Sequence, residues 1–243
     1  MRVHVIHTAR EAELCRFDEA LVVVIDALRA TTVMASALDA GAARIFTTLT
    51  VDDAFELKTK RPEAILCGER EGFAVPGFDY GNSPVEIGSI DLSGRDIVLT
   101  TTNGTRAVNA ASSASILLAA TLVNLDSVSQ WIKEQKDIEH TIDSIYLVCS
   151  GTNDRYSIDD VYVAGRLIQL LEDIPLSLSD SANAARMLAN RRADEIINPE
   201  ICFHAAYLAE KGLYRDVEYL LSGDRLMSVP RFLDGYFYDA YMR

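Results

Sequence analysis

The chain has few cysteines, and their spacing excludes the sites that cysteines commonly build. Its 243 residues include four of them, Cys15, Cys67, Cys149 and Cys202. No C-x-x-C pair occurs, so we expect neither a zinc knuckle nor a disulfide framework. A chain of this length buries roughly 70–75% of the surface that it exposes when unfolded, so the fold needs no structural metal. These features favour a reducing cytoplasm.

The sequence also has no long apolar segment and no excess of positive charge. No stretch approaches the ~18 apolar residues of a membrane span, and the N-terminus lacks the apolar core of a signal peptide. The formal net charge of -13 opposes binding to a nucleic-acid backbone, which depends on lysines and arginines. We therefore expect no membrane and no nucleic acid among the partners. A small anionic substrate is compatible, because a few arginines and backbone amides in one cleft reverse the local potential.

Proline is sparse as well, and no proline-rich linker divides the chain, so residues 1–243 are interpreted as one domain. Short apolar runs alternate with helix-like stretches, which predicts a three-layer α/β/α fold with a mostly parallel or mixed central sheet. Strands are predicted at residues 3–7, 21–25, 64–67, 97–101, 115–119 and 145–148. Helices are predicted at residues 31–40, 51–61, 104–111, 124–135, 158–172 and 180–190. Residues 71–92 are interpreted as a long ordered loop, and the chain from Asn198 as helical with a loop at residues 222–234.

An aspartate follows the second predicted strand in the string VVVIDALRATTVMASAL. A strand that delivers Asp26 to its carboxyl end places a carboxylate where open α/β sheets bind ligands. Thr31 or Thr32 is positioned to cap the next helix, whose N-terminus attracts a phosphate, and Arg29 adds a full positive charge. For this turn taken alone, an ordinary helix cap with a surface Asp–Arg pair is the favoured interpretation.

A second carboxylate with a neighbouring guanidinium follows the third predicted strand, in ILCGEREGFAVPGFDYGNSP. Glu69 and Arg70 repeat the layout of the first turn, and a guanidinium grips a carboxylate or phosphate through two hydrogen bonds. Ordinary turn chemistry explains GFDYGNSP. It explains Glu69 and Arg70 less well.

The most specific local signal is IVLTTTNGTRAVNAA, in which a strand runs through polar side chains into a helix. Its candidate phosphate-binding residues are Thr101, Thr102, Asn103, Gly104, Thr105 and Arg106. Hydroxyls, an amide, a permissive glycine and an arginine at a helix N-terminus form a phosphate cradle. The string is neither a Walker A loop nor a dinucleotide-binding turn, which disfavours kinases and dehydrogenases. A Thr-rich strand edge before a capped helix is the alternative.

A fourth string, YLVCSGTNDRYSIDDVYVAGRLI, places Asp159 and Asp160 at a helix start. Carboxylates there stabilise the helix dipole, and we interpret one of the two as having only that role. Cys149 follows a strand without a C-x5-R phosphatase loop, so it is interpreted as a buried small residue. The histidines form no pair that argues for a zinc site or a Ser-His-Asp triad. They are His4, His7, His140 and His204.

The strings IDALRATTVMASAL, GER with GFDYGNSP, LTTTNGTRA and SGTNDRYSIDDVYVAG occur in this order, and together they resemble the 2-phosphosulfolactate phosphatase family over residues 20–190. The resemblance implies a Mg²⁺-dependent phosphohydrolase that makes sulfolactate, a step in coenzyme M synthesis in methanogens. Asn153 and Tyr156 depart from the family pattern, which bears on the substrate more than on the reaction. The site residues that the resemblance implies are Asp26, Arg29, Glu69, Arg70, Thr101, Asn103, Gly104, Arg106 and Asp160.

Two functions compete. In a phosphatase, Mg²⁺ held by Asp26, Glu69 and Asp160 polarises the phosphoryl oxygens while arginines absorb the developing charge, and the attacking group is a metal-bound water or an aspartate. The alternative is a non-catalytic phosphometabolite-binding protein with the same anion cradle. Carboxylates beside a phosphate favour the enzyme, because a pure anion binder gains nothing from them unless a cation lies between. The sequence does not determine which substrate is used or whether the protein forms a homo-oligomer.

Overall fold

The computed structural model describes residues 1–135, 142–223 and 225–242. Every strand and helix predicted from the sequence occurs, with ends that shift by up to about three residues, and His140 lies outside the described residues. The strands are β1 Arg2–Ile6, β2 Ala20–Ile25, β3 Arg44–Thr48, β4 Ile65–Arg70, β5 Phe73–Ala74, β6 Asp96–Thr100, β7 Ile116–Ala120, β8 Ser144–Cys149, β9 Ser177–Leu178, β10 Pro230–Leu233 and β11 Tyr236–Asp239. The helices are α1 Ala9–Ala12, α2 Ala30–Asp39, α3 Val51–Lys60, α4 Pro84–Ile87, α5 Gly104–Ala110, α6 Leu125–Glu134, α8 Ile158–Leu170, α9 Asp180–Leu188, α10 Ala193–Ile196, α11 Phe203–Glu210 and α12 Tyr214–Leu221.

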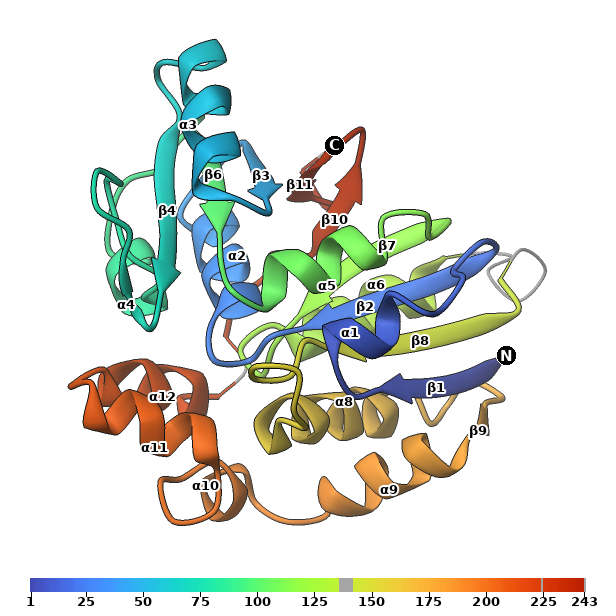
Figure 1. Cartoon of the computed structure of the whole chain (residues 1–243). Helices are drawn as coiled ribbons and strands as arrows, with labels where there is room; N and C mark the ends of the chain where they lie inside the picture. Colours follow the sequence, from blue (N-terminus) through green and yellow to red (C-terminus); the bar gives the residue numbers. More distant parts are fainter. Residues whose placement is uncertain (136–141, 224, 243) are drawn as a thin grey trace.

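Within the described residues, one eleven-stranded sheet has the order β5-β4-β6-β3-β11-β10-β7-β2-β8-β1-β9. Strands β7, β2, β8, β1 and β9 are parallel to one another, and so are β4, β6 and β3. The hairpin β10–β11 pairs antiparallel with β7 on one side and with β3 on the other, so the two parallel groups run in opposite directions. Figure 1 shows β4 and β6 directed towards the place where the chain leaves β2 and enters α2.

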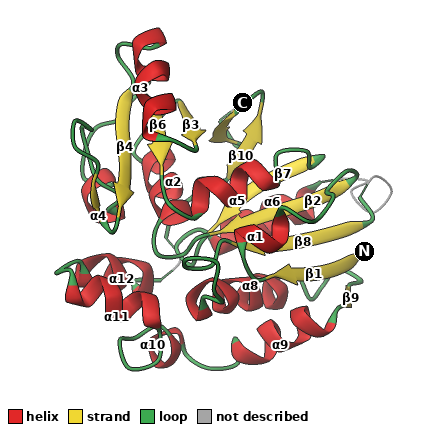
Figure 2. Cartoon of the chain, in the orientation of Figure 1, coloured by secondary structure: helices red, strands yellow, loops and turns green. Residues whose placement is uncertain are grey.

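Strand β2 shows how the sheet is buried on both faces. All six of its residues are buried, as a run of consecutive valines predicts for a strand between two helix layers. Leu21, Val23 and Ile25 belong to the core that includes residues of α6, α8 and α9. Val22 and Val24 belong to the core on the other face, with residues of α2 and α5. Helices lie on both sides of the strands in Figure 2, and the predicted three-layer α/β/α fold is confirmed.

The C-terminal tail corrects the prediction at residues 222–234. Helices α11 and α12 form as expected, but the chain then forms the hairpin β10–β11 in the interior of the sheet order, where the sequence predicted a loop in a helical tail. The turn residues Asp234 and Gly235 have φ values of 54° and 88°, in the left-handed region that Asp-Gly hairpin turns adopt. An Asp-Gly pair between apolar residues is the sequence signal of such a hairpin.

Three shorter segments also differ from the prediction. Residues 71–92 contain β5 and α4 rather than loop alone, and the short, half-polar strand β3 was not predicted. Arg29 is the N-cap of α2 and forms no side-chain capping hydrogen bond. Thr31 and Thr32 lie inside that helix, so neither threonine is its N-cap.

In the ranges that the structure describes, no helix is both long enough and apolar enough to cross a membrane. The interpretation of residues 1–243 as one domain stays a prediction.

Candidate functional site

A cavity of about 360 Å³ lies where the two parallel groups of strands end. The segments that follow β2, β6 and β8 contribute to its wall, as do the end of β4 with the segment after it and the first turns of α11. The lining residues are Asp26, Leu28, Arg29, Glu69, Arg70, Glu71, Gly72, Asn82, Thr101, Thr102, Asn103, Thr152, Asn153, Phe203, His204, Tyr207 and Leu208. All four strings that the sequence singled out therefore meet in one place. A cavity of this size holds a small organic acid.

Asp26 is placed at the cavity by the end of β2 and is held there by the first turn of α2. Its Oδ1 accepts a hydrogen bond from the Ala30 N–H at 3.1 Å, and its side chain is 6% exposed. Burial raises the pKa of this carboxyl, and the charge of His204 opposes the rise. A Cβ on Gly104 would lie 2.6 Å from Asp26 Oδ2, so the glycine is what allows α5 to approach the carboxylate. A cation in the cavity would stabilise the ionised form of Asp26.

Glu69 comes from β4 and lies beside the turn that follows β6. Its Oε1 accepts hydrogen bonds from the Thr102 N–H at 2.9 Å and from the Thr102 hydroxyl at 2.8 Å. Its Oε2 accepts a hydrogen bond from the Gly72 N–H at 3.0 Å. These three donors fix the carboxylate on the cavity wall and leave lone pairs for a further partner.

Two arginines of the wall are oriented by neighbouring groups. Arg29 donates to Asp216 Oδ2 at 2.7 Å and to the Gly72 carbonyl at 2.9 Å, and its side chain is 4% exposed. Arg70 donates to the Glu69 carbonyl at 2.7 Å. Asp216 lies in α12, and no sequence motif indicates its role because it stands 187 positions from Arg29. The two guanidinium groups supply positive charge to a protein whose net charge is -13.

The predicted phosphate cradle divides into a part on the cavity and a part behind it. Thr101, Thr102 and Asn103 line the cavity. The Thr105 N–H donates to Thr101 Oγ1 at 3.1 Å, so Thr105 supports the turn from behind. Arg106 is not among the lining residues.

Arg106 and the threonines of α2 form contacts of their own. Arg106 forms ion pairs with Glu13 and Asp154, both at 2.6 Å, outside the cavity. Thr31 donates to the Asp26 carbonyl at 2.9 Å, and Thr32 donates to the Ala27 carbonyl at 2.7 Å. Neither threonine lines the cavity, and the phosphate-binding role of all three residues stays a prediction.

Asp160 joins two of the turns rather than lining the cavity. Its Oδ1 accepts from the Ala27 N–H at 2.8 Å, and its Oδ2 accepts from the Gly151 N–H at 3.0 Å. Burial raises the pKa of Asp160 well above its usual value, and the charges of Asp159 and Asp26 add to the rise. Its predicted role as a metal ligand stays a prediction. Cys149 is fully buried and burial raises the pKa of its thiol, which confirms it as a buried small residue.

His204 is the cavity residue that the sequence analysis passed over. It follows the first residue of α11, and its Nδ1 lies 3.7 Å from Asp159 Oδ2 and 3.4 Å from Thr152 Oγ1. Burial alone lowers the pKa of His204, but the Asp159 carboxylate outweighs burial and the pKa is raised. An Asp at a helix start and a lone His 45 positions later give no local signal of a pair, because only the tertiary structure brings the start of α11 next to Asp159.

The carboxylates on the wall fit a magnesium ion of the kind that also binds substrate. Asp26 and Glu69 offer hard oxygen ligands in the cavity. Over the described residues, no three or more His, Cys, Asp or Glu side chains are grouped to hold a metal ion. Mg²⁺ commonly binds through one or two carboxylates, several waters and the substrate phosphate, so two carboxylates suffice.

Comparison with known proteins agrees with the composition of this cavity. A family model described as 2-phosphosulpholactate phosphatase matches residues 6–235. A protein of Carboxydothermus hydrogenoformans named "Probable 2-phosphosulfolactate phosphatase" is 40% identical over 214 residues, which cover 88% of this chain and 86% of that protein. Proteins with the same name from Thermotoga maritima and Clostridium acetobutylicum are 36% and 32% identical, and they cover 88% and 97% of this chain and 90% and 99% of their own lengths. The chain therefore belongs to the 2-phosphosulfolactate phosphatase family of phosphoric monoester hydrolases.

Proposed function

We propose that this protein hydrolyses 2-phosphosulfolactate to sulfolactate and phosphate, and that the reaction requires Mg²⁺. The observation that carries the proposal is that one small cavity is lined by the carboxylates of Asp26, Glu69 and Glu71 and by the guanidinium groups of Arg29 and Arg70. Carboxylates repel a phosphate unless a cation lies between them, whereas arginines attract it. The family to which the chain belongs supports the substrate.

Different residues of the wall would bind the metal ion and the phosphate. Asp26 and Glu69 are the residues that would hold Mg²⁺, which when bound polarises the phosphoryl group and lowers the pKa of a bound water. Arg29 and Arg70 neutralise the phosphate and the developing negative charge on its oxygens. Hydrolysis breaks the bond between phosphorus and the ester oxygen. Water supplies the new oxygen of the phosphate and the proton of the alcohol.

The two arginines of the wall also favour a substrate with more than one anionic group. A phosphate bound to one Mg²⁺ is largely neutralised, and two guanidinium groups then exceed what it needs. The carboxylate and sulfonate of phosphosulfolactate provide further anions. The cavity also holds the Asn82 side chain, which is 4% exposed and whose Oδ1 has no hydrogen-bond partner among the described residues.

The test is a phosphate-release assay on the purified protein with phosphosulfolactate, phospholactate, phosphoglycolate and p-nitrophenyl phosphate. We expect the highest kcat/KM on phosphosulfolactate, no turnover in excess EDTA and recovery when Mg²⁺ is restored. Full activity in excess EDTA would refute the metal requirement. Tight binding of phosphosulfolactate without phosphate release would identify a non-catalytic phosphometabolite-binding protein instead.

A further inference from the structure

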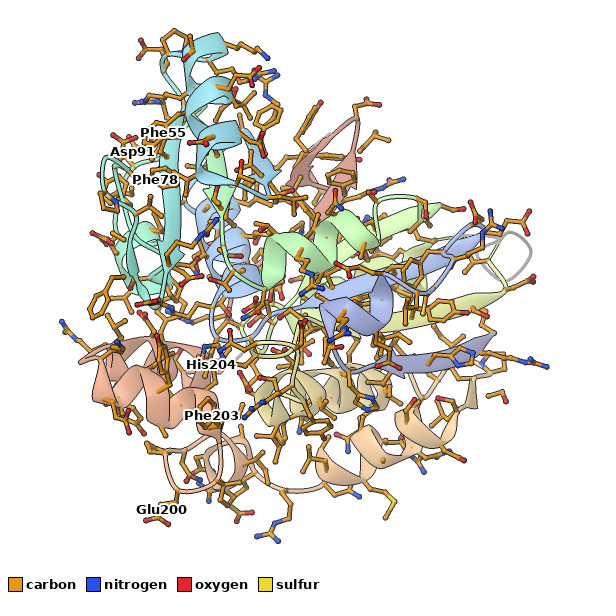
Figure 3. The ribbon with its side chains drawn as sticks, viewed as in Figure 1. Phe55, Phe78, Asp91, Glu200, Phe203 and His204 are labelled. Atoms are coloured by element: carbon orange, nitrogen blue, oxygen red, sulfur yellow. The ribbon has the colours of Figure 1, made fainter. Side chains whose placement is uncertain are left out.

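His204 lies where a group of the substrate can reach it. It belongs to the first turn of α11 and lines the same cavity as Asp26 and Glu69. Its side chain keeps 16% of its surface exposed although the residues around it are packed. Figure 3 shows His204 beside Phe203 at the end of α11 that faces the ends of the strands. The imidazole therefore forms part of the wall of the proposed catalytic cavity.

Asp159 lies behind the ring of His204, on the Nδ1 side. Nδ1 of His204 lies 3.7 Å from Asp159 Oδ2, and among the described residues this oxygen is buried without a hydrogen-bond partner. Asp159 Oδ1 accepts from the Ser157 hydroxyl at 2.9 Å and from the Cys202 thiol at 3.6 Å, so the carboxylate cannot turn freely. A small shift of the ring would complete a hydrogen bond from Nδ1 to Asp159. A carboxylate in this place fixes the tautomer and the direction of an imidazole.

The second ring nitrogen is left for the ligand. Polar contacts of His204 with described residues involve Nδ1 alone, through Asp159 and Thr152. Nε2 lies across the five-membered ring from the Cγ–Nδ1 bond, and no contact of Nε2 with another described residue is found. An imidazole held through Nδ1 with a free Nε2 on a cavity wall has the geometry of a general acid or base.

The reaction needs such a group at the leaving oxygen. The alcohol of an alkyl phosphate leaves as an alkoxide, which is a strong base and leaves readily only when it is protonated as the bond to phosphorus breaks. We propose that His204 donates this proton from Nε2 to the ester oxygen, and that Asp159 is the residue that positions the ring. This inference rests on the proposed phosphatase function.

The atoms balance over one turnover. Water forms the new bond to phosphorus as the bond to the ester oxygen breaks, and the ester oxygen takes a proton from His204. The attacking water loses one proton to solvent, and neutral His204 regains one proton from solvent. The products are the alcohol and inorganic phosphate, and the enzyme returns to its starting state.

The experiment compares two esters that differ only in the leaving atom. The first is 2-phosphosulfolactate, and the second is its analogue in which sulfur replaces the bridging ester oxygen. A thiolate is a much weaker base than an alkoxide, so the sulfur ester leaves without a proton donor. In His204→Asn we expect kcat on the oxygen ester to fall by about 10²-fold or more, the usual size of a general-acid contribution, and kcat on the sulfur ester to fall much less.

Further variants keep the comparison decisive. His4→Asn is the matched control, because His4 of β1 stacks on Tyr146 of β8 and does not line the cavity. It should leave kcat on both esters unchanged. Asp159→Asn and His204→Gln should show the same selective loss on the oxygen ester, and they replace His204→Asn if that variant fails to fold. Equal losses on the two esters in every folded His204 variant would overturn the inference. Failure of the wild-type protein to cleave either ester would instead overturn the proposed function.

Discussion

Arg29 and Asp216 form a buried ion pair at 2.7 Å, with side chains that are 4% and 3% exposed. The pair joins the turn after β2 to α12, which lies near the end of the chain. Asp216 also accepts a hydrogen bond from the Ser83 hydroxyl at 2.6 Å, so it links a third segment, the start of α4. The orientation of an arginine on the cavity wall therefore depends on the C-terminal helices.

We predict that Asp216→Ala reduces both stability and substrate binding. Removal of one partner leaves the Arg29 charge buried and unpaired, which costs about 3–5 kcal/mol of unfolding free energy. Urea unfolding and KM for phosphosulfolactate are the measurements. Glu218→Ala, an exposed acidic residue of the same helix, is the control and should change neither quantity. An Asp216→Ala protein with wild-type stability and KM would show that the pair has no structural role.

Asp26→Asn should separate catalysis from folding. Loss of a charge that the transition state needs lowers kcat by about 10²-fold or more. Because burial raises the pKa of Asp26, its ionised form weakens the folded state as pH rises above the usual carboxyl range, and the amide removes this effect. The variant should therefore be at least as stable as wild type at about pH 7, and this relative gain should be smaller near pH 4. Unchanged kcat would leave Asp26 with only its hydrogen bond to the Ala30 N–H.

Gly104→Ala should impair the site through crowding alone. The added Cβ would lie 2.5 Å from the Ala30 Cβ and 2.6 Å from Asp26 Oδ2, which forces α5 and α2 apart. We expect a loss of about 1–3 kcal/mol of unfolding free energy, typical of overpacking, together with a lower kcat. Gly81→Ala is the control, since its nearest new contact is 3.5 Å and therefore ordinary. Wild-type kcat and stability in Gly104→Ala would contradict the tight approach.

Arg70→Ala and Arg106→Ala should differ in their effect on KM, although the sequence analysis assigned both arginines to the phosphate. Arg70 lines the cavity, so Arg70→Ala should raise KM by about 10-fold or more, the effect of a lost charged hydrogen bond. Arg106 pairs with Glu13 and Asp154 outside the cavity, and exposed ion pairs contribute only about 0.2–1 kcal/mol to stability. Arg106→Ala should therefore leave KM within about twofold of wild type. Equal increases in KM would place Arg106 at the substrate after all.

The strands and turns that carry the carboxylates of Asp26 and Glu69 could be predicted from the sequence. The run Leu21–Val22–Val23–Val24–Ile25 predicts a strand buried on both faces. The polar residue that follows it, Asp26, must then lie at the carboxyl end of the strand, where open α/β sheets bind ligands. The same reasoning applies to Glu69 at the end of β4 and to Thr101 after β6. These signals are local, because the period of apolar side chains along a few residues determines which of them are buried.

Tertiary structure alone decided which residues join those turns. The sequence cannot show that β4 and β6 run opposite to β2 and β8, because that direction depends on the hairpin β10–β11 inserted between the groups. His204 and Asp216 come from C-terminal helices that carry no catalytic motif. His204 lines the cavity because α11 packs there, and Asp216 of α12 contacts Arg29 of the cavity wall. Arg106, by contrast, shares a string with Thr101 yet lies on the outside. Local pattern determines burial and secondary structure, whereas contacts between distant segments arise from the packing of the whole chain, and the site is made of such contacts.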